Sequence, residues 1–281
     1  MSRRAQALVL LLPAALLLAV LVGGSQVLMV VASLGRRSAY GGVLHDWGLQ
    51  NYVRAFDPLY LAVIGRSIVL AAATTVVCLL IGYPVAYWLA RHAPPTLRRG
   101  LLVLVILPFW TSFLVRMYAW IFLLRREGLV NLALEGMGLS GLDLLYRPAA
   151  VLLGQVYGEL PFIILPLYAA LEKLDGELLD AAADLGATPA EVLRQVVLPL
   201  SRPGIVAGCV LVFIPSLGAY LAPDLLGGAR VVYAGPLVQS QFAVARDIPF
   251  GAAVSLSLTA IVLAVLWLGR RALRALPGEH P

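Results

Sequence analysis

Charged residues are scarce in this chain of 281 amino acids, where they make up 13% of the sequence. A soluble domain usually has about 25% charged residues, so the composition excludes an ordinary soluble protein. Hydrophobic residues make up 61%, and the mean hydropathy is +0.90, as is typical of membrane proteins. There are only two cysteines, Cys78 and Cys209, and both lie in apolar runs. We expect them to be buried free thiols rather than a disulfide or metal ligands.

Sequence motifs for nucleotide, metal and nucleophile chemistry are also missing. The chain has no GxxxxGK[ST] loop, and its single lysine, Lys173, has no glycine-rich segment before it, so ATP is not expected to bind here. HExxH, paired-cysteine and nucleophile-elbow motifs are absent, and His45, His92 and His280 lie far apart. We therefore expect no catalytic residue, no metal site and no cofactor in this chain, and the energy for any work must come from a partner.

The main feature of the sequence is a series of long apolar runs. A run of about 20 apolar residues can cross a bilayer as a helix, and the first run is too long for a signal peptide, so we expect it to be retained. Prolines within the runs, Pro84 and Pro108 among them, predict kinks. The six predicted transmembrane helices are 7–34, 61–90, 101–124, 149–171, 204–223 and 249–269.

Arginines beside these runs predict the topology. They follow the second and sixth runs and precede the first, so the positive-inside rule places both termini in the cytoplasm, although other arginines fall in the outer loops. The net charge of +6 is thus read as topology rather than as nucleic-acid binding. The outer loops 125–148 and 224–248 contain apolar pieces that could be short interfacial helices or simple loops. The predicted parts are a first helix with its outer loop at 1–60, a five-helix transmembrane domain at 61–271 and a cytoplasmic tail at 272–281.

Residues 175–199 form a polar island between the fourth and fifth runs, and the sequence predicts two short helices there. Asp175 can cap the first helix, and Gly186 can end it in the left-handed conformation. Thr188 can cap the second helix, with Pro189 in its first position and Glu191 completing a capping box.

The first of these helices carries acidic residues, Glu177, Asp180 and Asp184, beside a narrow apolar face. One alternative is an amphipathic helix lying on the membrane surface. Such helices usually present Lys and Arg to anionic lipid, so an acidic helix there is disfavoured. Docking into a groove of a cytoplasmic protein is the interpretation that the charges favour.

The same stretch resembles the signature loop of ABC importer permeases, which reads Glu-Ala-Ala, three residues, Gly, nine residues, Ile, one residue and Leu-Pro. Here the triplet is Asp180, Ala181 and Ala182, followed at the family spacing by Gly186, Val196 and then Leu198-Pro199. The departures are Asp for Glu and Val for Ile. The resemblance implies a coupling helix that inserts into a cytoplasmic ATPase subunit. The contact residues that it implies are Glu177, Asp180, Ala181, Ala182, Gly186, Leu198 and Pro199.

Further blocks resemble the spermidine/putrescine type of ABC importer permease. They are residues 112–131, 157–171, 215–228 and 241–253, which cover much of the second half of the chain. The resemblance implies an all-α membrane protein with the six helices of a type I importer transmembrane domain, in the bacterial inner membrane. It also implies a second, homologous permease subunit, two ATP-binding subunits, an extracytoplasmic solute-binding protein and a polyamine or related solute.

Arg116 and Glu159 are the ionisable residues deepest in the apolar runs. Charge inside a membrane usually faces a partner or a cavity, so Glu159 could meet a cationic solute, or the two could pair and hold the bundle together. We favour the second alternative, in which Arg116 and Glu159 pair. Aromatic side chains lie nearby in sequence, and they could hold an ammonium group or form helix packing and the interfacial belt. The candidate pathway residues are Arg116, Tyr118, Trp120, Tyr157, Glu159 and Asp224. Asp224 and Asp247, near the outer mouth, could meet a binding protein, but solvated loop acids are the simpler interpretation.

Two other classes of protein remain as alternatives. A self-sufficient secondary transporter or channel would need buried carboxylates or an inverted repeat, and Glu159 is the one candidate carboxylate. A membrane-embedded enzyme would need a catalytic constellation, which the sequence does not show.

Overall fold

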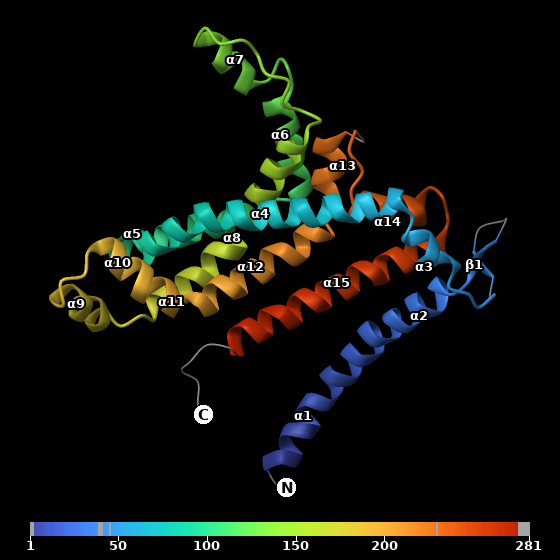
Figure 1. The fold of residues 1–281 in the computed structure, drawn as a ribbon, viewed down its shortest axis with the longest axis horizontal. Helices are drawn as coiled ribbons and strands as arrows, with labels where there is room; N and C mark the ends of the chain where they lie inside the picture. The colour runs from blue at the N-terminus through green and yellow to red at the C-terminus, as the bar shows by residue number, and fades with distance from the viewer. Residues whose placement is uncertain (1–2, 39–41, 45, 229, 275–281) are drawn as a thin grey trace. The chain divides into compact units, whose positions relative to one another are not determined.

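The computed structural model of the protein describes residues 3–38, 42–44, 46–228 and 230–274. His45, His280 and most of the expected tail lie outside the described residues. The described chain is built almost wholly from helices and divides into two compact units, residues 1–62 with 237–260 and residues 63–236 with 261–281 (Figure 1).

Four helices are long and apolar enough to cross a bilayer, and two bent helix pairs bring the number of candidate spans to six. The four are Leu11–Ser33, Pro58–Arg91, Pro148–Glu172 and Ile248–Arg271. The prediction of an all-α protein with six spans is confirmed, and the chain is a multi-pass membrane protein.

The third predicted span, 101–124, is not one straight helix. Helix α5, Pro95–Ile106, passes through a short 3₁₀ turn at Leu107–Trp110 and is followed by α6, Phe113–Leu124. The stretches Pro95–Trp110 and Phe113–Gly136 on either side of this break are bent by 93°. Pro108 cannot donate a helical hydrogen bond, and Thr111 adopts an extended conformation, which together end the helix.

The fifth predicted span, 204–223, also differs. Helix α12 runs from Arg202 to Leu217, and α13, Leu221–Gly227, is a separate short helix. The apolar pieces of the outer loops are helical: α7 spans Leu129–Gly136 and α14 spans Ala234–Ala243.

The first unit contains the N-terminal helix and an outer loop. Helix α1, Arg3–Leu18, continues through a π-helical turn at Ala19–Gly23 into α2, Gly24–Ser33. Two short antiparallel strands follow, β1 at Arg36–Arg37 and β2 at Val43–Leu44, and then α3, Gln50–Ala55. The Asn51 amide donates to the carbonyls of Ser33 and Gly35, which ties α3 to the end of α2.

The second unit is organised around α8, Pro148–Glu172, which lies beside α12 and α4, Pro58–Arg91 (Figure 1). Gly204 and Gly208 of α12 are four residues apart and face α8 without side chains. A Cβ atom at Gly204 would lie 2.5 Å from Ala170 Cβ, and one at Gly208 would lie 2.8 Å from a side-chain carbon of Ile163. This small-residue spacing lets two helices approach closely in a membrane. The sequence analysis did not use it, although GIVAG at 204–208 carries the signal.

Polar side chains in this core are paired across helices. Thr74 Oγ1 of α4 donates to Gln155 Oε1 of α8 at 3.1 Å, and Gln155 Nε2 donates to the carbonyl of Ser216 on α12 at 3.5 Å. Bonds between spanning helices replace the water that is missing inside a bilayer. They fix the relative register of the three helices.

Candidate coupling surface and membrane pathway

The polar island forms two short helices with the predicted caps. Helix α9, Gly176–Asp184, begins at Asp175, whose side chain accepts a hydrogen bond from the Glu177 N–H at 3.1 Å. Gly186 follows with φ of +85°, a conformation that favours glycine. The predicted cap and stop are therefore both present.

Helix α10, Pro189–Val192, begins at a complete capping box. Thr188 Oγ1 accepts from the Glu191 N–H, and Glu191 Oε2 accepts from the Thr188 N–H at 2.7 Å. The Thr188 hydroxyl also donates to Glu191 Oε2, and the two bonds from the Thr188 N–H and hydroxyl lower the pKa of Glu191 below its ordinary value, because they favour the carboxylate. A π-helical turn at Leu193–Val197 and the short helix α11, Leu198–Leu200, lead on to α12.

Two leucines on the apolar side of α9 stay uncovered by the described part of the chain. Leu178 is 51% exposed and Leu185 is 90% exposed, while Glu177, Asp180 and Asp184 are exposed around them. Among the other expected contact residues, Ala181 and Gly186 are exposed and Ala182 is half-buried. Leu198 and Pro199 are also half-buried, at the base of the segment. A solvent-facing leucine next to acidic residues is what a docking surface presents.

The base of the segment 175–199 is fixed to the membrane helices. Arg91 Nη2, at the end of α4, donates to the Leu174 carbonyl at 2.7 Å, and the hydroxyls of Tyr83 and Ser201 lie 3.0 Å apart. Leu179 and Leu193 pack against the core formed by α4, α8 and α12. We call the segment 175–199 the elbow. Any motion of the elbow must therefore be shared with these helices. Neither Arg91 nor Tyr83 was predicted to have this role.

Arg116 and Glu159 form no ion pair in the structure. The Arg116 guanidinium instead lies over the rings of Phe113 and Tyr157, at 5.1 Å and 5.8 Å from their centres. Glu159 Oε2 is buried and has no hydrogen-bond partner among the described residues, although the field of Arg116 acts on it. The pairing favoured from the sequence is therefore absent from this conformation, and the carboxylate keeps an unused acceptor.

The aromatic candidates divide into two groups. Trp120 packs edge-on against Tyr157, with ring centres 5.6 Å apart, so these two lie together with Arg116 between α6 and α8. Tyr118 is exposed on another face of α6. Asp224 is exposed in the first turn of α13. The structure thus brings Arg116, Trp120 and Tyr157 together, with Glu159 nearby, and leaves Tyr118 and Asp224 apart from them.

Asp247 is not a solvated loop acid. Its side chain is 6% exposed and accepts from Arg54 Nη1 at 2.7 Å. The Arg54 guanidinium also lies 4.0 Å from the centre of the Phe250 ring and donates to the hydroxyl of Tyr60, whose ring contacts Phe250 as well. This cluster within the first unit joins α3 to the start of α15, Ile248–Arg274. Its partners are 193 residues apart, so no sequence spacing could have indicated it.

Among the described residues, no group of three or more His, Cys, Asp or Glu side chains could hold a metal ion. Cys78 and Cys209 are free thiols; Cys78 is buried, as predicted, whereas Cys209 is half-buried.

Known proteins resemble this chain over most of its length. The family described as "Binding-protein-dependent transport system inner membrane component" matches residues 82–276. The spermidine/putrescine transport system permease protein PotB of Haemophilus influenzae is 44% identical over 226 residues, which are 80% of this chain and 79% of that protein. PotB of Escherichia coli K12 is 42% identical, with 80% and 83% covered. The molybdenum transport system permease protein ModB of Mycobacterium bovis is 36% identical, with 71% and 74% covered.

Solved structures agree on the fold. A bacterial ABC transporter involved in the import of alginate matches with a TM-score of 0.80 and 16% identity, covering 98% of this chain and 97% of that one. The MetNI methionine ABC transporter matches with a TM-score of 0.59 and 19% identity, covering 78% and 97%. The relatives found by sequence are permease components of transport systems, and the fold is that of an ABC importer transmembrane domain. The chain belongs to the family of binding-protein-dependent transport system inner membrane components.

Proposed function

We propose that this chain is a transmembrane permease subunit of an ATP-driven importer for polyamines such as spermidine and putrescine. Relatives named for spermidine and putrescine are 42–44% identical to it, whereas the molybdenum permease is 36% identical over a shorter part of the chain. The observation that carries the coupling role is the capped elbow, whose apolar face is exposed and whose base is hydrogen-bonded to α4.

In this proposal α9 docks into a cytoplasmic ATP-binding subunit. Leu185 enters a groove of that subunit, and Glu177, Asp180 and Gly186 lie at the contact. Nucleotide binding and hydrolysis move the subunit, and the elbow passes the motion to α4 and α8 through Arg91 and Leu193. The chain has no bond chemistry of its own and acts as a gate.

Its other partners follow from the same family membership. A second, homologous permease completes the pathway, and a solute-binding protein delivers solute to the outer face. Both chain ends and the elbow are cytoplasmic, in agreement with the arginines after α4 and in α15.

The cluster of Trp120, Tyr157 and Glu159 is the proposed meeting point with the amine. Aromatic faces attract an ammonium group, and a carboxylate oxygen without a protein partner can accept its hydrogen bonds. The positive charge of Arg116 repels an ammonium group. The amine must therefore approach Glu159 from the side that faces away from the Arg116 guanidinium. We expect Glu159→Gln to raise the KM for spermidine more than it lowers the maximal uptake rate.

Transport by the reconstituted importer tests the proposal. Proteoliposomes with the chain, its partner permease, the ATPase and the binding protein should take up labelled spermidine or putrescine only with ATP inside the compartment that holds the ATPase. Molybdate should not be taken up. Solute uptake by the purified chain alone would contradict the proposal, because it would indicate a secondary transporter or channel.

The docking surface can be tested separately by exchange of one exposed leucine. Leu185→Asp should abolish co-purification of the ATPase subunit while the membrane complex stays folded, because the side chain makes little contact within the chain. Leu129→Asp is the matched control, since this leucine is also exposed, at 66%, but lies at the start of α7. Full ATP-coupled uptake by Leu185→Asp would contradict the assignment of α9.

A further inference from the structure

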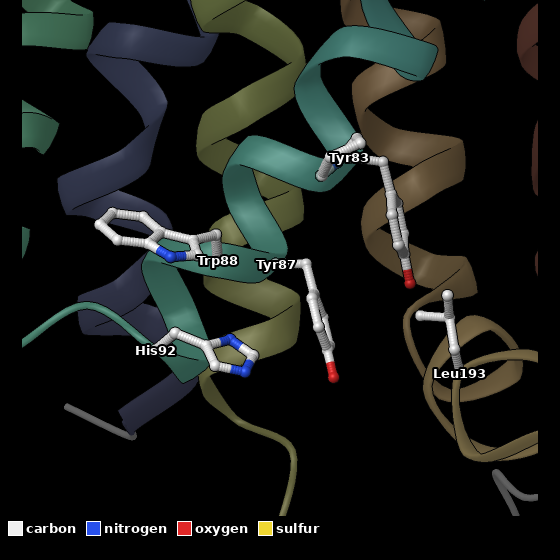
Figure 2. Close-up of a pocket in the computed structure, with 6 residues that line it drawn as sticks. Tyr83, Tyr87, Trp88, His92 and Leu193 are labelled. Atoms are coloured by element: carbon white, nitrogen blue, oxygen red, sulfur yellow. The ribbon is translucent and has the colours of Figure 1, made fainter. Parts of the chain in front are cut away.

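Two apolar hollows lie next to each other at the C-terminal end of α4, where Arg91 bonds to the base of the elbow. The first, of about 350 Å³, is lined by Tyr83, Pro84, Tyr87, Trp88, His92 and Leu193 (Figure 2). The second, of about 450 Å³, lies between α4 and α5 and is lined by Pro84, Val85, Trp88, Leu89, Leu101, Leu104 and Val105. Both fall in the range of about 300–1,000 Å³ that is usual for ligand pockets.

Trp88 and Pro84 line both hollows, so the indole of Trp88 is their common wall. On one side of it the lining is aromatic, and Figure 2 shows the rings of Tyr83 and Tyr87 extending from α4, with the His92 ring beside Tyr87. On the other side the lining is aliphatic. A forked molecule with two apolar branches would fit across this wall, with one branch on each side.

The turn between α4 and α5, which adjoins the lining residues His92 and Leu101, is basic. Arg91, Arg98 and Arg99 fall within nine residues of sequence at the turn between α4 and α5. Arg91 and Arg98 make bonds to the protein, but each keeps a buried Nε without a hydrogen-bond partner among the described residues. Arg99 is exposed, and the described part of the chain offers it no ion pair or hydrogen bond. The one acid bonded here, Glu172, is shared between Arg98 and Tyr168.

This arrangement discriminates between possible ligands. An amine would be attracted by the aromatic rings but repelled by the three guanidinium groups. A hydrophilic anion would find no hydrogen-bond partners in two hollows lined almost entirely by apolar atoms. Tryptophan and tyrosine at headgroup level, with arginine beyond them, are typical of a site for a lipid with an anionic headgroup.

We infer that α4, α5 and the elbow together bind one anionic phospholipid. Its two acyl chains lie on either side of Trp88, and its headgroup phosphate contacts Arg99, the exposed arginine of this turn, while Arg91 and Arg98 add positive charge behind it. Leu193, in the π-helical turn of the elbow, lines the first hollow, so the bound lipid touches the segment that transmits motion. The assignment to the cytoplasmic leaflet and the role of the elbow in transmitting motion rest on the proposed function.

The test uses the assembled importer in nanodiscs of phosphatidylglycerol or phosphatidylcholine with identical acyl chains. Native mass spectrometry after release into detergent counts the lipids retained. The wild-type complex should retain one phosphatidylglycerol in preference to phosphatidylcholine. Arg99→Gln should reduce that preference about fivefold, the factor expected for one basic residue near a headgroup at roughly 1 kcal/mol. Arg126→Gln, an exposed arginine in the loop between α6 and α7, should leave it unchanged.

A second variant addresses the hollows themselves. Leu104→Trp fills the space between α4 and α5, so it should lower retention of both lipids without altering the headgroup preference of what remains. A photoreactive residue at position 104 should crosslink to phospholipid. Lipid retention that is unchanged in both Arg99→Gln and Leu104→Trp would overturn the inference. Crosslinking of position 104 to the second permease would also overturn it.

The outcomes separate this inference from the proposed function. Spermidine uptake with no lipid preference would overturn the lipid site and leave the importer assignment intact. A complex that retains phosphatidylglycerol through Arg99 but transports no polyamine would support the lipid site and overturn the polyamine importer assignment.

Discussion

The ion pair between Arg54 and Asp247 is buried on one side only, so we predict that loss of each partner changes protein stability by a different amount. Asp247 is almost fully enclosed, whereas Arg54 is 46% exposed. Removing the arginine therefore leaves a buried carboxylate without its charged partner. Removing the aspartate leaves a guanidinium that water can reach. We expect Arg54→Gln to destabilise the protein clearly more than Asp247→Asn.

The magnitudes follow from burial. Breaking a fully buried pair costs about 3–5 kcal/mol, and the half-exposed arginine places Arg54→Gln near the lower end, at about 3 kcal/mol. Part of this, roughly 0.5–1 kcal/mol, is the lost contact of the guanidinium with the Phe250 ring. Asp247→Asn loses one charged hydrogen bond, and solvent screening of Arg54 reduces its cost to about 1 kcal/mol. The difference is about 2 kcal/mol.

Thermal unfolding in detergent at one fixed heating rate measures this difference. For a chain of this size, about 2 kcal/mol corresponds to roughly 4 °C in apparent Tm. Arg36→Gln is the matched control, because its ion pair with Asp46 is exposed on both sides, at 57% and 63%, and its loss should leave Tm unchanged. An Asp247→Asn variant that unfolds at the same temperature as Arg54→Gln, or below it, would refute the reasoning.

Three more predictions follow from single positions. Gly204→Ala should cost about 1–3 kcal/mol of stability, measured as a lower apparent Tm, because the added methyl would lie 2.5 Å from Ala170 Cβ, whereas Gly100→Ala in α5 meets no atom within 4 Å and should not. Gly186→Val should cost about 1–2 kcal/mol locally, because a branched residue resists φ of +85°, and should uncouple ATP hydrolysis from uptake. Protection of the amides at residues 188–192, taken relative to the intrinsic exchange rate at each pH, should persist as the pH falls toward 4.5 and be lost only below it. The capping bonds lower the pKa of Glu191, so its stabilisation is present above that range and lost as the carboxylate is protonated. Loss of protection near pH 6 would contradict that pKa direction.

The sequence predicted the elbow well because its structure is determined locally. Caps, the left-handed glycine and the capping box depend on residues within four positions of one another, and all of them are present. The apolar runs likewise predicted the long helices to within a few residues, since hydrophobic length alone defines a span.

The misses have a different origin. The break at Pro108 and the separation of α13 from α12 occur inside apolar sequence, where hydropathy does not change. Proline indicated a kink, but nothing local determines an angle of 93°. The partners of Asp247 and Glu159 depend on packing between distant helices, so the sequence could name these acids without predicting that one is paired and the other is not.

The elbow is held by local caps and by bonds at its base, and this bears on the coupling role proposed for it. Helices of nine and four residues are too short to be stable alone in water, and they bury little apolar surface. Their order therefore comes from capping at both starts, from Gly186 between them and from the bonds of Arg91 and Tyr83 at the base. A flexible segment would absorb the displacement of a docked subunit, whereas a capped and anchored one passes it to α4. Substitutions at the base, such as Arg91→Gln, should then leave the ATPase bound while transport falls, which is the opposite of what Leu185→Asp should do.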